Sequence, residues 1–184
     1  MPVMELSTLP DPATATDPLA IQAFTEIQQE LGFGIVPNIF RSMAHNPALL
    51  AANWQKFKHT ILVGTLPRTV KEMLGVIVSD ANRSMYARLV HLHSLSVQGV
   101  QELWLQHLTN PDSDDSTLPD SLRAMIAFTR QAARDPQGLT GAHYQDLEDS
   151  GLSESEIAEV IATIDLFQSV NAYTDLARVP IDRI

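Results

Sequence analysis

The sequence predicts an all-helical protein, and three observations support this fold class. Apolar residues recur three and four positions apart, which is the spacing of an amphipathic helix. Helix-capping residues recur along the chain, and Asp17-Pro18 is the first example, a capping side chain followed by proline in the first turn. No stretch shows the strict apolar-polar alternation of a half-buried strand. We therefore expect an irregular N-terminal arm over residues 1–16 and a single all-helical domain over residues 17–184.

Start and stop signals in the sequence delimit the expected helices. A proline or a capping side chain opens most of them, and a glycine or a polar break closes most of them. In the last helix, Ser153 caps the first turn and Glu156 reaches back to form a capping box. The polar, acidic residues 110–119 are predicted to be a loop between two halves of one domain. The predicted helical ranges are 18–31, 37–44, 47–63, 67–81, 84–98, 102–108, 122–135, 140–150 and 153–177.

Charge and hydropathy exclude several classes of partner. The chain has 12 Lys and Arg against 22 Asp and Glu, a net charge of -10, and nucleic-acid affinity depends on clustered cations. We therefore expect no nucleic-acid partner. The longest apolar stretch, Met73–Val78, is too short to span a bilayer, and residues 1–17 lack the basic and apolar regions of a signal peptide. A cytoplasmic protein without a membrane partner is the expectation.

The chain contains no cysteine, which excludes disulfides, thiolate metal sites and cysteine nucleophiles. His91 and His93 are two residues apart and point to opposite sides of a helix, so we expect no metal there. The acidic run from Asp112 to Asp115 lacks the ligand spacing of a calcium loop and is interpreted as a solvated loop. No glycine-rich phosphate loop is present, and no bound cofactor is expected.

A candidate site lies on the adjacent predicted helices 67–81 and 84–98. At about 100° per residue, Ser84, Ala87 and His91 share one side of the second helix. If the two helices pair antiparallel, Glu72 on the first would face that side. Simpler explanations also apply: a lone helical histidine is more often structural than catalytic, and Glu72 lies near a helix start, where acids favour the dipole.

This pattern resembles the redox motif of the alkyl hydroperoxidase D / carboxymuconolactone decarboxylase superfamily. Glu72, Asn82, Tyr86 and His91 stand where that motif has its acid, asparagine, tyrosine and histidine. Ser84 and Ala87 occupy the two cysteine positions. The similarity extends over roughly residues 20–180 and is strongest to an uncharacterised peroxidase-related branch. It implies an alkyl hydroperoxidase D-like helical bundle that forms a homo-oligomer. Further matching segments are 36–40, 46–50, 139–140, 151–153 and 156–157, together with Leu147, Phe167, Asn171 and Asp175.

In cysteine-bearing relatives the acid and the histidine are thought to relay a proton to the reactive thiol. Here Glu72, His91 and Ser84 would be a vestigial catalytic set, because serine does not cycle through sulfenic acid and disulfide. The resemblance thus implies a peroxidase-related protein without thiol peroxidase activity. We expect it to bind a small apolar ligand between its helices.

Two alternatives remain open from the sequence. The first is cofactor-free acid/base catalysis, as a lyase, decarboxylase or isomerase, with Glu72 and His91 as base and acid. For an anionic substrate, Arg83 or Arg88 would then supply positive charge. The second is a structural protein whose apolar helix faces serve assembly alone.

Overall fold

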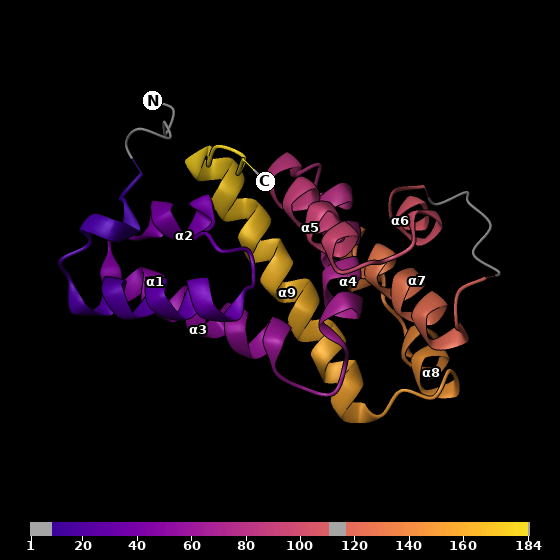
Figure 1. Ribbon diagram of the computed structural model, residues 1–184. Helices are drawn as coiled ribbons and strands as arrows, with labels where there is room; N and C mark the ends of the chain where they lie inside the picture. The colour runs from indigo at the N-terminus through magenta and orange to yellow at the C-terminus, as the bar shows by residue number, and fades with distance from the viewer. Residues whose placement is uncertain (1–8, 111–116, 184) are drawn as a thin grey trace.

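The computed structural model describes residues 9–110 and 117–183, and within them it contains nine α-helices and no strand (Figure 1). The all-helical class predicted from the sequence is therefore confirmed. The helices are α1 (Pro18–Glu30), α2 (Asn38–Met43), α3 (Pro47–Phe57), α4 (Arg68–Ala81), α5 (Met85–Val97), α6 (Glu102–Thr109), α7 (Asp120–Arg134), α8 (Gly141–Asp149) and α9 (Glu154–Ala177).

Helix α9 crosses the middle of the molecule and joins its two halves (Figure 1). On one side α1 packs against α3, with α2 beside them; on the other, α7 packs against α8. Helices α4 and α5 lie between, and both contact α9. Nine consecutive residues of α4, Lys71–Ser79, are buried. A helix enclosed on all sides is the core of its domain, and the candidate acid lies on it.

Local sequence signals fix the helix ends as expected. The Asp17 side chain accepts hydrogen bonds from the first turn of α1, and Ser153 and Glu156 form the predicted capping box of α9. Between α4 and α5 the chain reverses at Arg83, whose φ of 57° is in the left-handed region. The two helices pack closely against each other because this turn is so short.

Two details of the backbone differ from the prediction. The third predicted helix is divided: α3 ends at Phe57, and Lys58–Leu62 forms a π-helical segment. The arm, expected to be irregular, contains a 3-10 turn at Pro12–Thr14. Residues 111–116 of the predicted acidic loop, with its aspartate run, lie outside the described residues, as do residues 1–8.

An ion pair between buried Lys71 and half-buried Glu159 fixes the loop that leads into α4. Lys71 is 1% exposed; its Nζ lies 2.7 Å from Glu159 Oε2 and donates to the Val63 carbonyl at 2.6 Å. Glu159 also accepts from the backbone N–H groups of Thr65 and Leu66, at 2.7 and 3.1 Å. These bonds tie the loop to α9 and set where α4 begins.

No helix in the described part of the chain is long and apolar enough to cross a bilayer.

Candidate functional site

The structure brings the predicted acid and the predicted histidine together. Glu72 on α4 is 1% exposed and His91 on α5 is 7% exposed, and Glu72 Oε2 lies 3.7 Å from His91 Nδ1. The other oxygen, Oε1, accepts from Arg68 Nε at 2.6 Å, one turn earlier on α4. Arg68, Glu72 and His91 therefore form a row that begins at the surface and ends at a buried ring.

Glu72 is ionised at neutral pH although it is buried. Burial by itself raises the pKa of a carboxyl. The contacts with His91, and then those with Ser94 and Arg68, outweigh burial and lower the pKa of Glu72 from 4.5 to about 2. A fixed negative charge therefore lies beside His91 Nδ1, which favours the tautomer with its proton on Nδ1 and leaves Nε2 as an acceptor.

The His91 ring is held by aromatic neighbours that the sequence analysis did not connect with it. Phe167 of α9 meets the ring edge-on, with centroids 4.7 Å apart, and Phe57 stacks at 6.5 Å. Phe167 can lie so close because residue 75 is glycine: a Cβ there would overlap its ring. Glycine inside a helix costs stability, so Gly75 was a signal of close helix packing that could have been used.

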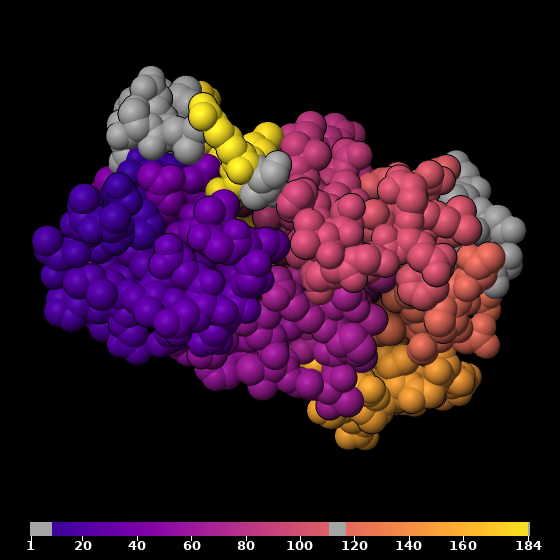
Figure 2. Space-filling model, viewed as in Figure 1, coloured from indigo at the N-terminus to yellow at the C-terminus, as the bar shows by residue number. Residues whose placement is uncertain are grey.

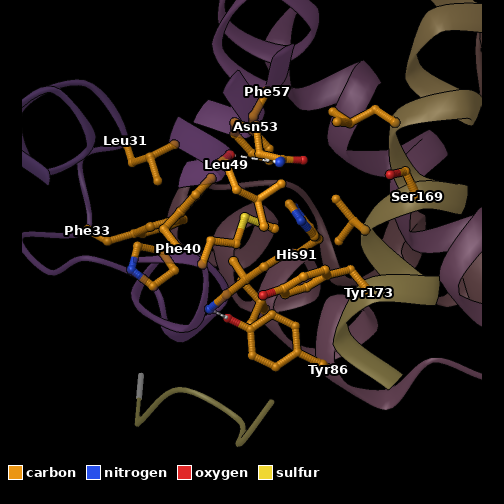
Figure 3. A pocket seen from close by; sticks show the side chains of 16 residues that line it. Leu31, Phe33, Phe40, Leu49, Asn53, Phe57, Tyr86, His91, Ser169 and Tyr173 are labelled. Atoms are coloured by element: carbon orange, nitrogen blue, oxygen red, sulfur yellow. Dashed lines mark hydrogen bonds between the residues drawn. The ribbon is translucent and has the colours of Figure 1, made fainter. Parts of the chain in front are cut away.

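His91 also lines a partly enclosed cavity of about 260 Å³ (Figure 3). The walls are predominantly apolar, and the polar side chains among them are Asn53, Tyr86, His91, Ser169 and Tyr173. Glu72 is not part of the lining and lies behind His91. The apolar lining comes from Leu31, Phe33, Pro37, Ile39, Phe40, Met43, Leu49, Phe57, Val90, Leu166 and Val170.

The C-terminal segment holds one of the residues that line this cavity, Tyr86. The hydroxyl of Tyr86 accepts from the Ile39 backbone N–H at 3.1 Å and donates to Asp182, which itself accepts from the Asn38 N–H at 2.8 Å. Burial raises the pKa of Tyr86 well above its usual value, and burial also raises the pKa of Asp182. In Figure 2 the yellow C-terminal segment lies across the top, against the indigo N-terminal part. The Tyr86 hydroxyl therefore already has a donor, the Ile39 N–H, and an acceptor, Asp182.

Ser84 and Ala87 lie apart from the cavity. Ser84 is the N-cap residue of α5 and has an extended backbone, and like His91 it contacts α9. It is fully buried, and its hydroxyl donates to Asp175 at 3.1 Å. Ala87 is buried in the core. Of the three predicted positions, His91 alone lines the cavity.

Two further residues named from the sequence have other partners. Asn82 donates to Gln168 at 2.7 Å, and Arg88 lies 3.6 Å from Asp80. Neither Arg83 nor Arg88 lines the cavity, and the cation next to the acid is Arg68. Among the residues that the structure describes, no three metal-ligating side chains are placed to hold an ion.

Comparison with known proteins places this fold in a recognised class. No protein-family model and no curated protein matches the sequence. Solved structures do match over almost the whole chain, and they include proteins described as peroxidase-related and as having an alkylhydroperoxidase AhpD core. The chain has this AhpD-like fold, as the motif resemblance predicted.

Three of these structures illustrate the match. An uncharacterised peroxidase-related protein from Ralstonia eutropha JMP134 is 23% identical, with a TM-score of 0.82, over 95% of this chain and 90% of that one. One from Silicibacter sp. TM1040 is 20% identical, with a TM-score of 0.80, over 97% and 96%. The debrominase Bmp8, as a cysteine-to-alanine variant in complex with 2,3,4-tribromopyrrole, is 24% identical, with a TM-score of 0.81, over 98% and 93%.

Proposed function

We propose that this protein binds a small, largely apolar ring compound in the cavity beside His91 and has no thiol peroxidase activity. The observation that carries the proposal is an apolar cavity whose lining includes one imidazole backed by an ionised carboxylate. Apolar walls with few, well-placed polar groups are typical of small-molecule sites. The polar groups would orient the ligand, and the walls would supply most of the affinity.

The size of the cavity favours ligands of one or two rings. An engineered apolar cavity of about 150 Å³ is large enough for benzene, and this cavity measures about 260 Å³. The tribromopyrrole in the Bmp8 complex is a small halogenated ring of this kind. Support for the same ligand class here comes from the shared fold together with the volume and apolar lining of this chain's own cavity.

A titration with a blocked variant tests ligand binding. Val170 lines the cavity, so Val170→Phe fills part of it, whereas Val97 is 68% exposed and lies outside it. By calorimetry with one-ring aromatics, including 2,3,4-tribromopyrrole, we expect Val170→Phe to lower affinity at least about tenfold, a loss of about 1.4 kcal/mol. Val97→Phe should leave affinity unchanged. Equal affinities for both variants and the wild type would place the ligand elsewhere.

The peroxidase part of the proposal rests on the absent sulfur. Ser84 and Ala87 stand at the cysteine positions of the motif, and the chain has no cysteine anywhere in its sequence. A hydroxyl cannot be oxidised and reduced through the thiol cycle. With an organic hydroperoxide and a dithiol reductant, the rate at which the hydroperoxide is consumed should equal the rate in a protein-free blank. Robust turnover that depends on the reductant would refute this part.

Acid/base catalysis remains a second candidate, favoured by the contact between Glu72 and His91 at the cavity wall. Because Glu72 does not line the cavity, His91 would exchange the proton with the substrate and Glu72 would position it. Proton NMR in heavy water can detect exchange of the α-protons of small carbonyl compounds. His91→Gln should abolish any exchange that the wild type catalyses; exchange that survives in this variant would end the idea.

We also propose that the chain forms a homo-oligomer. Exposed apolar side chains gather on α5 and at the end of α9, which favours a partner surface. Light scattering should give a mass above that of one chain, and a monomer would contradict the proposal. The residues are Met85, Leu89 and Leu176, the last 87% exposed.

A further inference from the structure

The row that ends at His91 has alternating charges. Arg68 is positive and bonds Glu72, and Glu72 is negative and contacts His91. Arg68 also reaches the cavity wall, because it donates to the Leu31 carbonyl at 3.1 Å and lies over the Phe33 ring at 5.8 Å. Arg68 and Glu72 balance each other, so an imidazolium at His91 would leave one positive charge uncompensated. An anion in the cavity would compensate it.

His91 is the group in the cavity lining that is placed to take a proton from a ligand. The side chains packed on its ring from α3 and α9 are Phe57 and Phe167, which carry no charge, and α4 contributes Glu72. The other titratable groups in the lining are two tyrosines. Tyr86 is bonded to Asp182, and Tyr173 lies 3.4 Å from the Ser42 hydroxyl.

We propose that the cavity selects acidic rings, such as phenols and azoles with electron-withdrawing substituents, and binds them as anions paired with a protonated His91. This inference rests on the proposed function and names its ligand class. The ligand O–H or N–H bond breaks, its electron pair stays on the ligand, and the proton moves to His91 Nε2. The bound anion, the His91 imidazolium, the Glu72 carboxylate and the Arg68 guanidinium would then lie in one row with alternating charges.

The ion pair with His91 would make the cavity prefer acidic rings to neutral rings of the same shape. An imidazolium buried without partners is costly. Here Glu72 lies on its Nδ1 side, and a bound anion would supply the partner on its Nε2 side. A hydrogen bond between two charged groups is roughly twice as strong as a neutral one. A non-acidic ring of the same shape gains the apolar contacts but cannot form this pair.

A matched pair of probes tests the inference. Para-nitrophenol and its methyl ether, para-nitroanisole, have nearly the same shape, and the first absorbs differently as phenol and as phenolate. Below the pKa of the free phenol, we expect the wild-type protein to bind the phenol at least about tenfold more tightly than the ether. Binding should also produce the phenolate absorption band.

Variants separate this pairing from ordinary cavity binding. His91→Gln keeps a polar side chain in the lining but accepts no proton, so it should remove the band and make the two affinities similar. Glu72→Gln should weaken the band, because the neighbouring negative charge is gone. Circular dichroism would establish that each variant is folded.

The outcomes are distinguishable. Equal binding of phenol and ether by the wild type, without a phenolate band, would overturn the selection of acids but leave the proposed ligand cavity intact. Binding of neither probe would count against the cavity function itself. A band of full strength in His91→Gln would mean that another group takes the proton and would also overturn the inference.

Discussion

Glu72 carries the charge on which the site depends, and its low pKa predicts how stability responds to acid. The pKa is 4.5 in the unfolded chain and about 2 in the folded one. Between these values the unfolded chain binds more protons, so stability is complete above pH 4.5 and falls as pH decreases toward 2. The loss attributable to this group is about 3 kcal/mol, measurable by urea denaturation at several pH values.

The pH dependence of wild-type stability is compared with that of Glu72→Gln, whose amide at this position does not titrate. Its stability should fall less steeply than that of the wild type over the same range of pH. Glu148→Gln removes an exposed carboxyl on α8 and should keep the wild-type slope. A Glu72→Gln profile parallel to that of the wild type would contradict an ionised, stabilising Glu72.

Gly75 provides a second prediction at the scale of one residue. A Cβ at this position would overlap the Phe167 ring, whereas a Cβ at Gly141 meets no atom within 4 Å. Gly75→Ala should destabilise the protein by about 1–3 kcal/mol through overpacking. Gly141→Ala should be close to neutral. Thermal unfolding of both variants measures the contrast, and equal midpoints would show that α4 and α9 are not packed as described.

Site residues can be predicted from the sequence where the relation between them is local. Glu72 and His91 lie on consecutive helices joined by a short turn, so their positions along the chain predicted their contact. Ser84 donates to Asp175 of α9, a partner that spacing along one helix does not identify. The Gly75 and Phe167 contact joins residues far apart in the chain, and apolar spacing along one helix does not identify partners on another.

At the scale of elements, the start of α4 depends on the pair of buried Lys71 and half-buried Glu159. Lys71→Met removes a charged hydrogen bond from each of Glu159 and the Val63 carbonyl, so it should cost about 2 kcal/mol. The control is Lys56→Met, because Lys56 and Asp165 form a pair whose side chains are 43% and 69% exposed. That pair should contribute less than about 1 kcal/mol. Similar losses in urea denaturation would contradict the structural role of Lys71.

Most helices could be predicted because caps and apolar spacing are local. The π-helical segment Lys58–Leu62 could not, since Ile61 fits the helical apolar pattern whether the turn is α or π. The loop of residues 63–66 is fixed by Glu159 from α9, and a contact over more than ninety positions leaves no local pattern.

At the scale of the whole molecule, the cavity arises only when distant segments meet. Its lining is drawn from the turn after α1 and from α2, α3, α5 and α9, and the C-terminal Asp182 holds Tyr86 in place. Apolar residues on each helix predicted burial but not the space left between helices. The fold was therefore predictable from the sequence, whereas the ligand site required the packed structure.

A crystal structure grown with 2,3,4-tribromopyrrole tests the central claim most directly, because bromine is located by its anomalous scattering. The account predicts bromine peaks inside the cavity, with the ring in contact with His91 and the walls formed by Phe57 and Val170. Peaks confined to other surfaces, such as the groove between α7, α8 and α9 lined by Phe128 and Tyr144, or a cavity without bromine would contradict it.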